Sequence, residues 1–232
     1  PGLANRIAIP AASRVCCNFP ETIPHLPEGK AVLSGSPIRA ELLHGDKKRA
    51  YTYTCLTPEK PVILVVGGSS GSKIINDTVR SLQPQILKNY QVIHLCGKGN
   101  LDPTLHNTEG YVQYEYANAE LADFFAVSEL VISRAGANSI CELLALHKPN
   151  ILIPLSRNAS RGDQILNANS FQKQRAADSG PSGHITAIIL SLCALCASCS
   201  ICSISWFPFC QDAPSYPWLC YSCAVCILYM PV

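Results

Sequence analysis

The sequence predicts an α/β fold, in which a parallel β-sheet carries helices on both faces. Between Pro61 and Leu155, short apolar runs typical of strands alternate with segments whose apolar residues recur at helical spacing. Most of the strand-like runs are apolar at nearly every position, as in strands that are buried on both faces. Ligands of such sheets bind beyond the carboxyl ends of the strands. The turns Gly67–Ser72 and Ser133–Asn138 are therefore the first candidates for a site.

The first predicted strand, Pro61–Val66, is the apolar run PVILVV, and it ends at the glycine-rich stretch GGSSGS. A helix is expected next, because apolar residues recur at helical spacing at Ile74, Ile75, Val79 and Leu82. The later strands are expected at Gln91–Gly97, Gly110–Tyr116, Leu130–Ser133 and Asn150–Leu155.

The remaining helices are expected at Ala119–Val127 and Ser139–Leu146, and Pro149 would stop the second one. Residues 1–60 are less regular. Within them, Asn18–Gly29 and His44–Lys60 are expected to be loops and a linker.

The chain has 232 residues and a formal net charge of +2. So small a charge gives no case for a nucleic-acid partner, which is bound by clustered basic side chains. The cysteines of the first 178 residues lie in apolar contexts without the spacing of metal ligands, and we expect reduced core thiols. They are Cys16, Cys17, Cys55, Cys96 and Cys141.

The stretch Gly67–Lys73 fits two interpretations. Glycines let the backbone approach a ligand closely, and the start of the following helix offers free N–H groups to a phosphate. However, a P-loop needs a glycine before the lysine and a serine or threonine after it, and the G-x-G-x-x-G motif is absent. A plain tight turn remains the alternative.

Glu142, expected in the first turn of its helix, also fits two interpretations. Ser139-x-x-Glu142 has the spacing of a capping box, in which the glutamate reaches back to the N–H of the cap residue. Alternatively, a carboxylate at the end of a parallel sheet can accept both hydroxyls of a ribose diol. Spacing does not decide between them.

Two further polar residues have open roles. Gln164, in the polar segment Ser156–Ala168, either hydrogen-bonds a sugar or belongs to a surface loop that leads into a helix. His94 is expected at the carboxyl end of a strand and lies either near the site or packed inside the sheet.

Six stretches resemble, in order and with similar spacing, the carboxyl-terminal half of the bacterial peptidoglycan glycosyltransferases of family 28. They are PGLANRIAIPAA, GSPIR, VILVVGGSSGSKIIND, VIHLCGKGN, ADFFAVSELVISRAGANSICELLALHKPNILIPLS and ASRGDQILNANSF. The resemblance runs from Pro1 to about Gln174 and is strongest to the versions from Firmicutes. It implies a GT-B fold, built from two Rossmann-like domains, of which the second holds the nucleotide sugar.

The resemblance implies a hexosyltransferase that moves N-acetylglucosamine (GlcNAc) from UDP-GlcNAc to undecaprenyl-diphosphate-linked muramyl-pentapeptide. This reaction converts lipid I to lipid II in peptidoglycan synthesis, with inversion at the anomeric carbon. The implied partners are UDP-GlcNAc, lipid I and the cytoplasmic face of the cell membrane, where the protein would be peripheral. No cofactor and no metal is implied, and the chain has no Asp-x-Asp pair to hold Mg²⁺.

The resemblance also assigns roles to residues by their position. Arg39 would contact the UDP phosphates and Ser69 the pyrophosphate, while the backbone near Ala117 would meet the uracil. Gln164 would touch the GlcNAc. The nucleoside would be wrapped by Ala137, Asn138, Ser139, Ile140, Cys141 and Glu142, with the ribose hydroxyls on Glu142.

The resemblance divides the chain into three parts. Residues 1–36 match the end of the family's amino-terminal acceptor domain, whose histidine, the expected general base, has no counterpart here. Residues 37–178 match the nucleotide-sugar domain. We therefore expect donor binding with little transfer and no catalytic residue in this chain. The alternative is a non-catalytic UDP-GlcNAc-binding subunit that needs a membrane-anchored partner.

Residues 179–232 match nothing in the family. They contain eight of the 13 cysteines, and Asp212 is their only Asp, Glu, Lys or Arg residue. Three interpretations are open: a frameshifted reading frame, a membrane span over Ile185–Phe209, or an iron–sulfur or zinc site.

Overall fold

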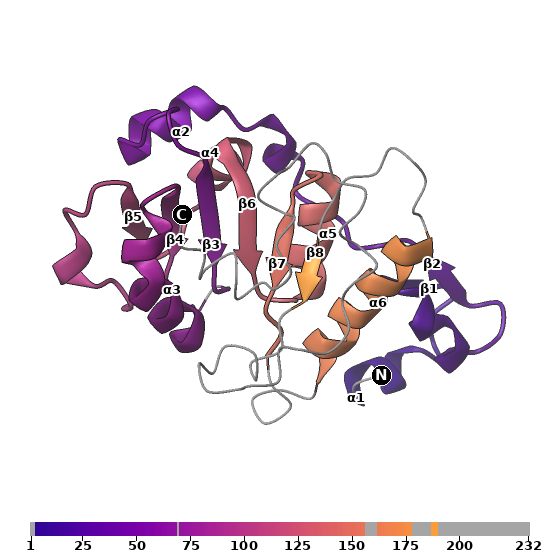
Figure 1. Ribbon diagram of the computed structural model, residues 1–232. Helices are drawn as coiled ribbons and strands as arrows, with labels where there is room; N and C mark the ends of the chain where they lie inside the picture. The colour runs from indigo at the N-terminus through magenta and orange to yellow at the C-terminus, as the bar shows by residue number, and fades with distance from the viewer. Residues whose placement is uncertain (1–2, 69, 156–161, 178–186, 190–232) are drawn as a thin grey trace.

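The computed structural model describes residues 3–68, 70–155, 162–177 and 187–189 (Figure 1). Its largest element is a six-stranded sheet with the strand order β5-β4-β3-β6-β7-β8, and all neighbouring strands are parallel. The strands are β3 (Val62–Val66), β4 (Gln91–Leu95), β5 (Tyr111–Tyr114), β6 (Ser128–Ser133), β7 (Asn150–Leu152) and β8 (Ala187–Ile189). The predicted parallel sheet is confirmed, and each of the five predicted strands overlaps an observed one.

Helices cover both faces of this sheet, because its side chains alternate between two cores. In β3, Val62 and Leu64 face one core, while Ile63 and Val65 face the other. The first core is closed by α4, α5 and α6, and the second by α3. The helices are α3 (Lys73–Ile86), α4 (Glu120–Val127), α5 (Ala137–Ala145) and α6 (Asp163–Ala177).

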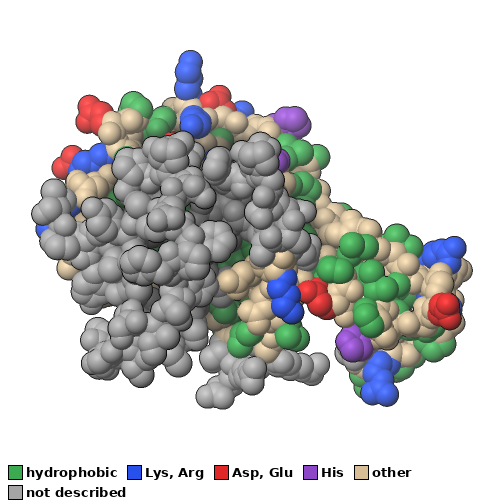
Figure 2. All heavy atoms as spheres, turned by 45° about the vertical axis from the view of Figure 1, so that its right-hand side comes forward, with side chains coloured by type: hydrophobic (Ala, Val, Ile, Leu, Met, Phe, Trp, Pro, Cys, Tyr) green, Lys and Arg blue, Asp and Glu red, His purple; other side chains and the backbone are tan. Residues whose placement is uncertain are grey.

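A small N-terminal unit lies beside α6, at the right of Figure 1. It consists of α1 (Leu3–Ala8), β1 (Val15–Cys17), the 3₁₀ helix η1 (Pro20–His25) and β2 (Ala31–Leu33), and β1 and β2 pair in parallel. Ser170 of α6 donates a 2.7 Å hydrogen bond to Glu21 of this unit. Figure 2 shows apolar side chains on the surface of the unit, and the exposed ones include Leu3, Ile7, Ile23, Val32 and Leu33.

Helix α2 (Lys47–Thr54) lies where the sequence predicted a loop and linker, so the prediction for His44–Lys60 is wrong over Lys47–Thr54. The Asp46 carboxylate caps the helix by accepting a backbone N–H of the first turn. Arg49 then donates through two nitrogens to the buried Asp123 of α4, at 2.7 and 2.9 Å. These bonds hold the pKa of Asp123 below its usual value. The partner that fixes α2 is thus distant in sequence.

The cysteine prediction holds only in part. Cys17 and Cys96 are buried thiols, whereas Cys16 and Cys55 are exposed and Cys141 is half-buried. Cys16 points outward because alternate residues of β1 face opposite sides, and Cys55 ends α2 in the left-handed conformation, with φ 55°. Among the described residues, no group of three His, Cys, Asp or Glu side chains could hold a metal ion.

Most of the tail lies outside the described residues, including its cysteines. Within the predicted span Ile185–Phe209, the structure describes Ala187–Ile189, which pair with β7 as strand β8. In the described ranges, no helix is long and apolar enough to cross a membrane.

Candidate functional site

The turns that follow β3 and β6 lie side by side. The two strands are parallel neighbours, and Val66 pairs with Ser133 at the end of the ladder. Gly67–Ser72 and Ser133–Asn138 therefore leave the sheet together at the carboxyl edge, by which we mean the edge formed by the carboxyl ends of the strands. β7 ends in the same row, since Leu152 pairs with Ser133. The expectation that both turns meet at one end of the sheet is confirmed.

Arg134, which the sequence analysis missed, joins these turns. Its side chain is buried and donates to the Ser72 hydroxyl at 2.5 Å and to the Ile153 carbonyl at 3.2 Å. It thus connects the loops that follow three neighbouring strands. Burial lowers the pKa of Arg134, and no carboxylate pairs with it in the described part of the chain. An arginine directly after an apolar strand was the signal that could have identified it.

The glycine-rich turn is pressed against the end of β4. A Cβ atom on Gly71 would lie 1.9 Å from the carbonyl oxygen of Cys96, and one on Gly97 would lie 2.3 Å from the nitrogen of Gly71. Both glycines also have a positive φ, so neither position accepts another residue without a shift of the backbone. Ser69, predicted to bond the pyrophosphate, lies outside the described residues.

Helix α5 starts at Ala137, two residues before its predicted start. The cap residue is Gly136, which has no side chain to cap the helix. Ser139 is therefore the third helical residue, and Glu142 lies in the second turn. The capping-box interpretation is wrong, because the chain turns into the helix at the glycine and the glutamate carboxylate is bonded elsewhere. The first N–H groups of α5 are left without a side-chain cap at the carboxyl edge.

Glu142 is paired with Arg39, which is 103 residues away in sequence. Arg39 Nε and Nη2 donate to Glu142 Oε1 at 3.3 and 3.2 Å. Ser36 makes a second contact from the same segment, donating to Asn138 Oδ1 at 2.9 Å. The segment between the N-terminal unit and the sheet therefore lies over the start of α5. Arg39, predicted to contact the phosphates, and Glu142, predicted to bind the ribose hydroxyls, are therefore in direct contact with each other.

The other predicted site residues differ in their access to this edge. The Ile140 side chain is buried in the core, so only its backbone can face a ligand, while Ala137 and Cys141 are half-buried. Gln164 Oε1 accepts the Leu155 N–H at 3.0 Å and so ties α6 to the loop after β7. Ala117 follows β5, three strands from β6, and packs on the core. Ligand roles for these residues stay predictions.

His94 belongs to the core. The Asn76 amide donates to the Cys96 carbonyl, which turns its oxygen toward His94 Nε2 at 3.0 Å. His94 Nε2–H therefore donates to Asn76, and the Tyr111 hydroxyl donates to Nδ1 at 2.7 Å. Burial, helped by the nearby Arg80, lowers the pKa of His94 to about 3. Of its two open roles, the packed strand histidine is the one observed.

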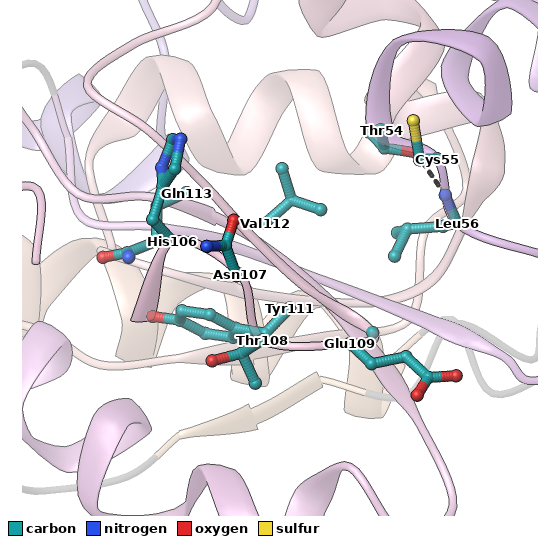
Figure 3. Close-up of a pocket in the computed structure, with 11 residues that line it drawn as sticks. Thr54, Cys55, Leu56, His106, Asn107, Thr108, Glu109, Tyr111, Val112 and Gln113 are labelled. Carbon is teal, nitrogen blue, oxygen red and sulfur yellow. Dashed lines mark hydrogen bonds between the residues drawn. The ribbon is translucent and has the colours of Figure 1, made fainter. Parts of the chain in front are cut away.

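A cavity of about 280 Å³ lies at the opposite, amino edge of the sheet (Figure 3). Two of the polar side chains around it are hydrogen-bonded within the protein. The Thr54 hydroxyl accepts the Leu56 N–H, drawn as the dashed line, and Gln113 binds Arg80 and the Asp102 backbone. The lining residues are Thr54, Cys55, Leu56, His106, Asn107, Thr108, Glu109, Gly110, Tyr111, Val112 and Gln113. This cavity is separate from the candidate site.

The carboxyl edge combines three kinds of polar group. The uncapped start of α5 presents backbone donors and the positive end of a helix dipole, which favour an anion. Arg39 adds a half-exposed cation, and Glu142 adds a carboxylate that can accept hydroxyl protons. Such a set suits a ligand that carries both negative charge and neighbouring hydroxyl groups.

The fold defines a class, the carboxyl-terminal Rossmann-like domain of GT-B glycosyltransferases. The structure is similar to the crystal structure of Acinetobacter baumannii MurG, with a TM-score of 0.55 and 20% identity over 82% of this chain and 50% of that one. It is also similar to the calicheamicin glycosyltransferase CalG4, with a TM-score of 0.52 and 13% identity over 79% of this chain and 42% of that one. Identities this low show the shared fold alone.

The family follows from the sequence match. A family model described as "Glycosyltransferase family 28 C-terminal domain" matches residues 62–179. The chain therefore belongs to glycosyltransferase family 28, as the resemblance indicated.

Curated relatives carry the name UDP-N-acetylglucosamine--N-acetylmuramyl-(pentapeptide) pyrophosphoryl-undecaprenol N-acetylglucosamine transferase. The relative from Lachnospira eligens is 64% identical over 173 residues, which are 75% of this chain and 49% of that protein. The relative from Clostridium perfringens strain SM101 is 59% identical over 173 residues, which are 75% of this chain and 48% of that protein. The chain spans about half the length of the curated relatives it matches.

The burial of His94 predicts a pH dependence of stability. Its folded pKa of about 3 lies below the ordinary value of 6.5, so below pH 6.5 the unfolded chain takes up a proton that the folded chain does not. The free energy of unfolding should fall as the pH drops from about 6.5 toward 3, by up to about 1.4 kcal/mol per pH unit from this residue. We expect urea unfolding at pH 7.0, 6.0 and 5.0 to give a free energy of unfolding that falls with falling pH. In His94→Gln this dependence on pH should be weaker. An unchanged slope in the variant would contradict the assignment.

Replacement of Arg134 should loosen the carboxyl edge. Arg134→Met keeps most of the side-chain volume but leaves the Ser72 hydroxyl and the Ile153 carbonyl without this donor. We expect the free energy of unfolding to fall by about 1–3 kcal/mol, measured by urea denaturation. A variant as stable as the parent would show that the buried charge costs as much as its hydrogen bonds contribute.

Proposed function

We propose that the chain binds UDP-GlcNAc at its carboxyl edge and serves the transfer of GlcNAc to lipid I in peptidoglycan synthesis. The single observation that carries this proposal is the convergence of the β3 turn, the start of α5 and the Arg39–Glu142 pair at one end of the sheet. The names and the 59–64% identity of the relatives support the choice of ligand.

The proposed pose follows the chemistry of each group. The uridine lies along the start of α5, with its ribose hydroxyls on Glu142, and the diphosphate faces the glycine-rich turn and the α5 dipole. Arg39 would contact the phosphates, and Gln164, beside the loop after β7, would contact the GlcNAc. Ala137–Cys141 and the backbone near Ala117 would supply the remaining contacts.

The proposed reaction is an inverting displacement at the anomeric carbon. An acceptor hydroxyl attacks the sugar from one side while UDP leaves from the other. The donors and the helix dipole at the carboxyl edge would stabilise the negative charge that develops on UDP. The described residues hold no cluster of metal ligands, and the proposed mechanism routes no step through a metal or cofactor.

The acceptor side is proposed to depend on groups beyond those at this edge. The N-terminal unit would border the acceptor-binding part, and its exposed apolar side chains, such as Leu3 at 75% and Ile7 at 71% exposure, favour coverage by another protein segment. This observation also favours the second candidate function, a UDP-GlcNAc-binding subunit with a membrane-anchored partner. In either case the protein would work at the cytoplasmic face of the membrane as a peripheral protein.

Replacement of Glu142 tests the donor site. Glu142→Ala should weaken UDP-GlcNAc binding by about 1.5–3 kcal/mol, because it removes an ionised acceptor from the ribose hydroxyls. Isothermal titration calorimetry on the full chain measures the change.

The matched control is Glu59→Ala, which removes an exposed glutamate just before β3, at the amino edge. It should bind like the parent. Equal affinity of all three proteins, or no binding of UDP or UDP-GlcNAc by the folded parent, would refute the donor-site proposal.

A transfer assay tests the finer proposal on the acceptor side. The polypeptide of these 232 residues, incubated with labelled UDP-GlcNAc and lipid I, should produce little or no lipid II. Turnover near that of a full-length family member would overturn this expectation. Turnover restored by a separately supplied membrane-anchored partner would favour the subunit.

A further inference from the structure

The two oxygens of Glu142 are in different situations. Two nitrogens of Arg39, Nε and Nη2, donate to Oε1, at 3.3 and 3.2 Å. Among the described residues, Oε2 accepts no hydrogen bond. The carboxylate is therefore held at one oxygen, while the other is free of hydrogen bonds from the described residues.

The arginine side of this pair is also held in place. Ser36, three residues before Arg39, donates to Asn138 Oδ1 at 2.9 Å, so the segment is bound to α5 at two points. The exposed fraction of the Glu142 side chain is 17%, against 53% for Arg39. The carboxylate is thus the less exposed partner, and the Arg39 Nη1 group makes no hydrogen bond with a described residue.

We propose that Arg39 is a positioning residue for Glu142, fixing its carboxylate so that Oε2 accepts the hydroxyls of a ribose diol. This inference rests on the proposed function, in which Glu142 binds ribose. A free glutamate side chain has many rotamers, and a contact of Oε2 with both hydroxyls of a diol needs one of them. Because guanidinium has five N–H donors, Arg39 can hold Glu142 with one edge and present Nη1 to a phosphate.

This role differs from the role of a phosphate ligand in one measurable respect. If Arg39 only contacted phosphate, it would not affect the choice between ribose and 2′-deoxyribose. If it positions Glu142, the preference for ribose depends on it, even in a ligand that has no phosphate.

The experiment compares UDP with 2′-deoxy-UDP, and uridine with 2′-deoxyuridine, on the full chain. Affinities are measured by calorimetry for the nucleotides and by NMR titration for the nucleosides. The parent should prefer each ribose form by about tenfold, the effect of one good hydrogen bond to a charged group. In Arg39→Ala the preference should fall to about twofold or less in both pairs.

Two further variants separate positioning from general damage. Arg39→Lys keeps the charge but cannot place two donors on Oε1, so the preference should be intermediate. Arg6→Ala removes an exposed arginine of α1 and should leave the preference at the parent value. Thermal unfolding of each variant confirms that the fold is intact.

Three results would overturn the proposal. Equal loss of affinity for UDP and 2′-deoxy-UDP in Arg39→Ala, with the preference intact, would leave Arg39 as a phosphate ligand only. Tighter uridine binding by that variant would show that Arg39 competes with the ribose for Glu142. A folded parent that binds no UDP, or shows no preference for ribose, would refute the proposed function itself and this inference with it.

Discussion

The parallel pairing of β3 with β6 is the constraint on which the candidate site depends. These strands are separated by about 60 residues of sequence, yet Val66 and Ser133 end in the same row of the sheet. A shift of one residue would turn every side chain of β6 to the opposite core. The two cores therefore fix the register, and the register fixes where the turns emerge. Arg134 extends this control beyond the strands, because it bonds the loops after β3 and β7.

Five strands of the large sheet and three of its helices could be predicted because their signals are local. Continuous apolar runs and helical spacing located all five predicted strands and the helices α3, α4 and α5. Helix α2 escaped prediction because its apolar face is weak and its main partner, Asp123, lies 74 residues from Arg49. The predicted start of α5 lies two residues after the observed one. Ser139 has the chemistry of a cap residue, whereas the observed cap residue is Gly136.

The sequence identified most residues of the candidate site but not the contacts between them. Spacing alone left Glu142 open between two roles, and the resemblance then added Arg39 and Glu142 as separate ligands. Their direct contact spans 103 residues and depends on the path of the segment after the N-terminal unit, which no local pattern specifies. Arg134 was missed for a related reason. Its partners are a serine hydroxyl and a backbone carbonyl, so no paired charge in the sequence points to it, and its place directly after an apolar strand was the one available signal.

Two groups at the carboxyl edge carry positive charge that no described side chain neutralises. Arg134 is buried without a carboxylate partner in the described ranges, and the start of α5 lacks a side-chain cap. Burial costs the Arg134 cation its hydration, which its bonds to Ser72 and Ile153 offset in part, and the start of α5 has N–H groups that no side chain caps. An anion at this edge would offset both costs at once, because it accepts hydrogen bonds from the helix and lowers the energy of the nearby cation. The Arg39–Glu142 pair carries no net charge and leaves that potential intact, so in the proposed function Glu142 would select for hydroxyl groups while the start of α5 and Arg39 would face the phosphates.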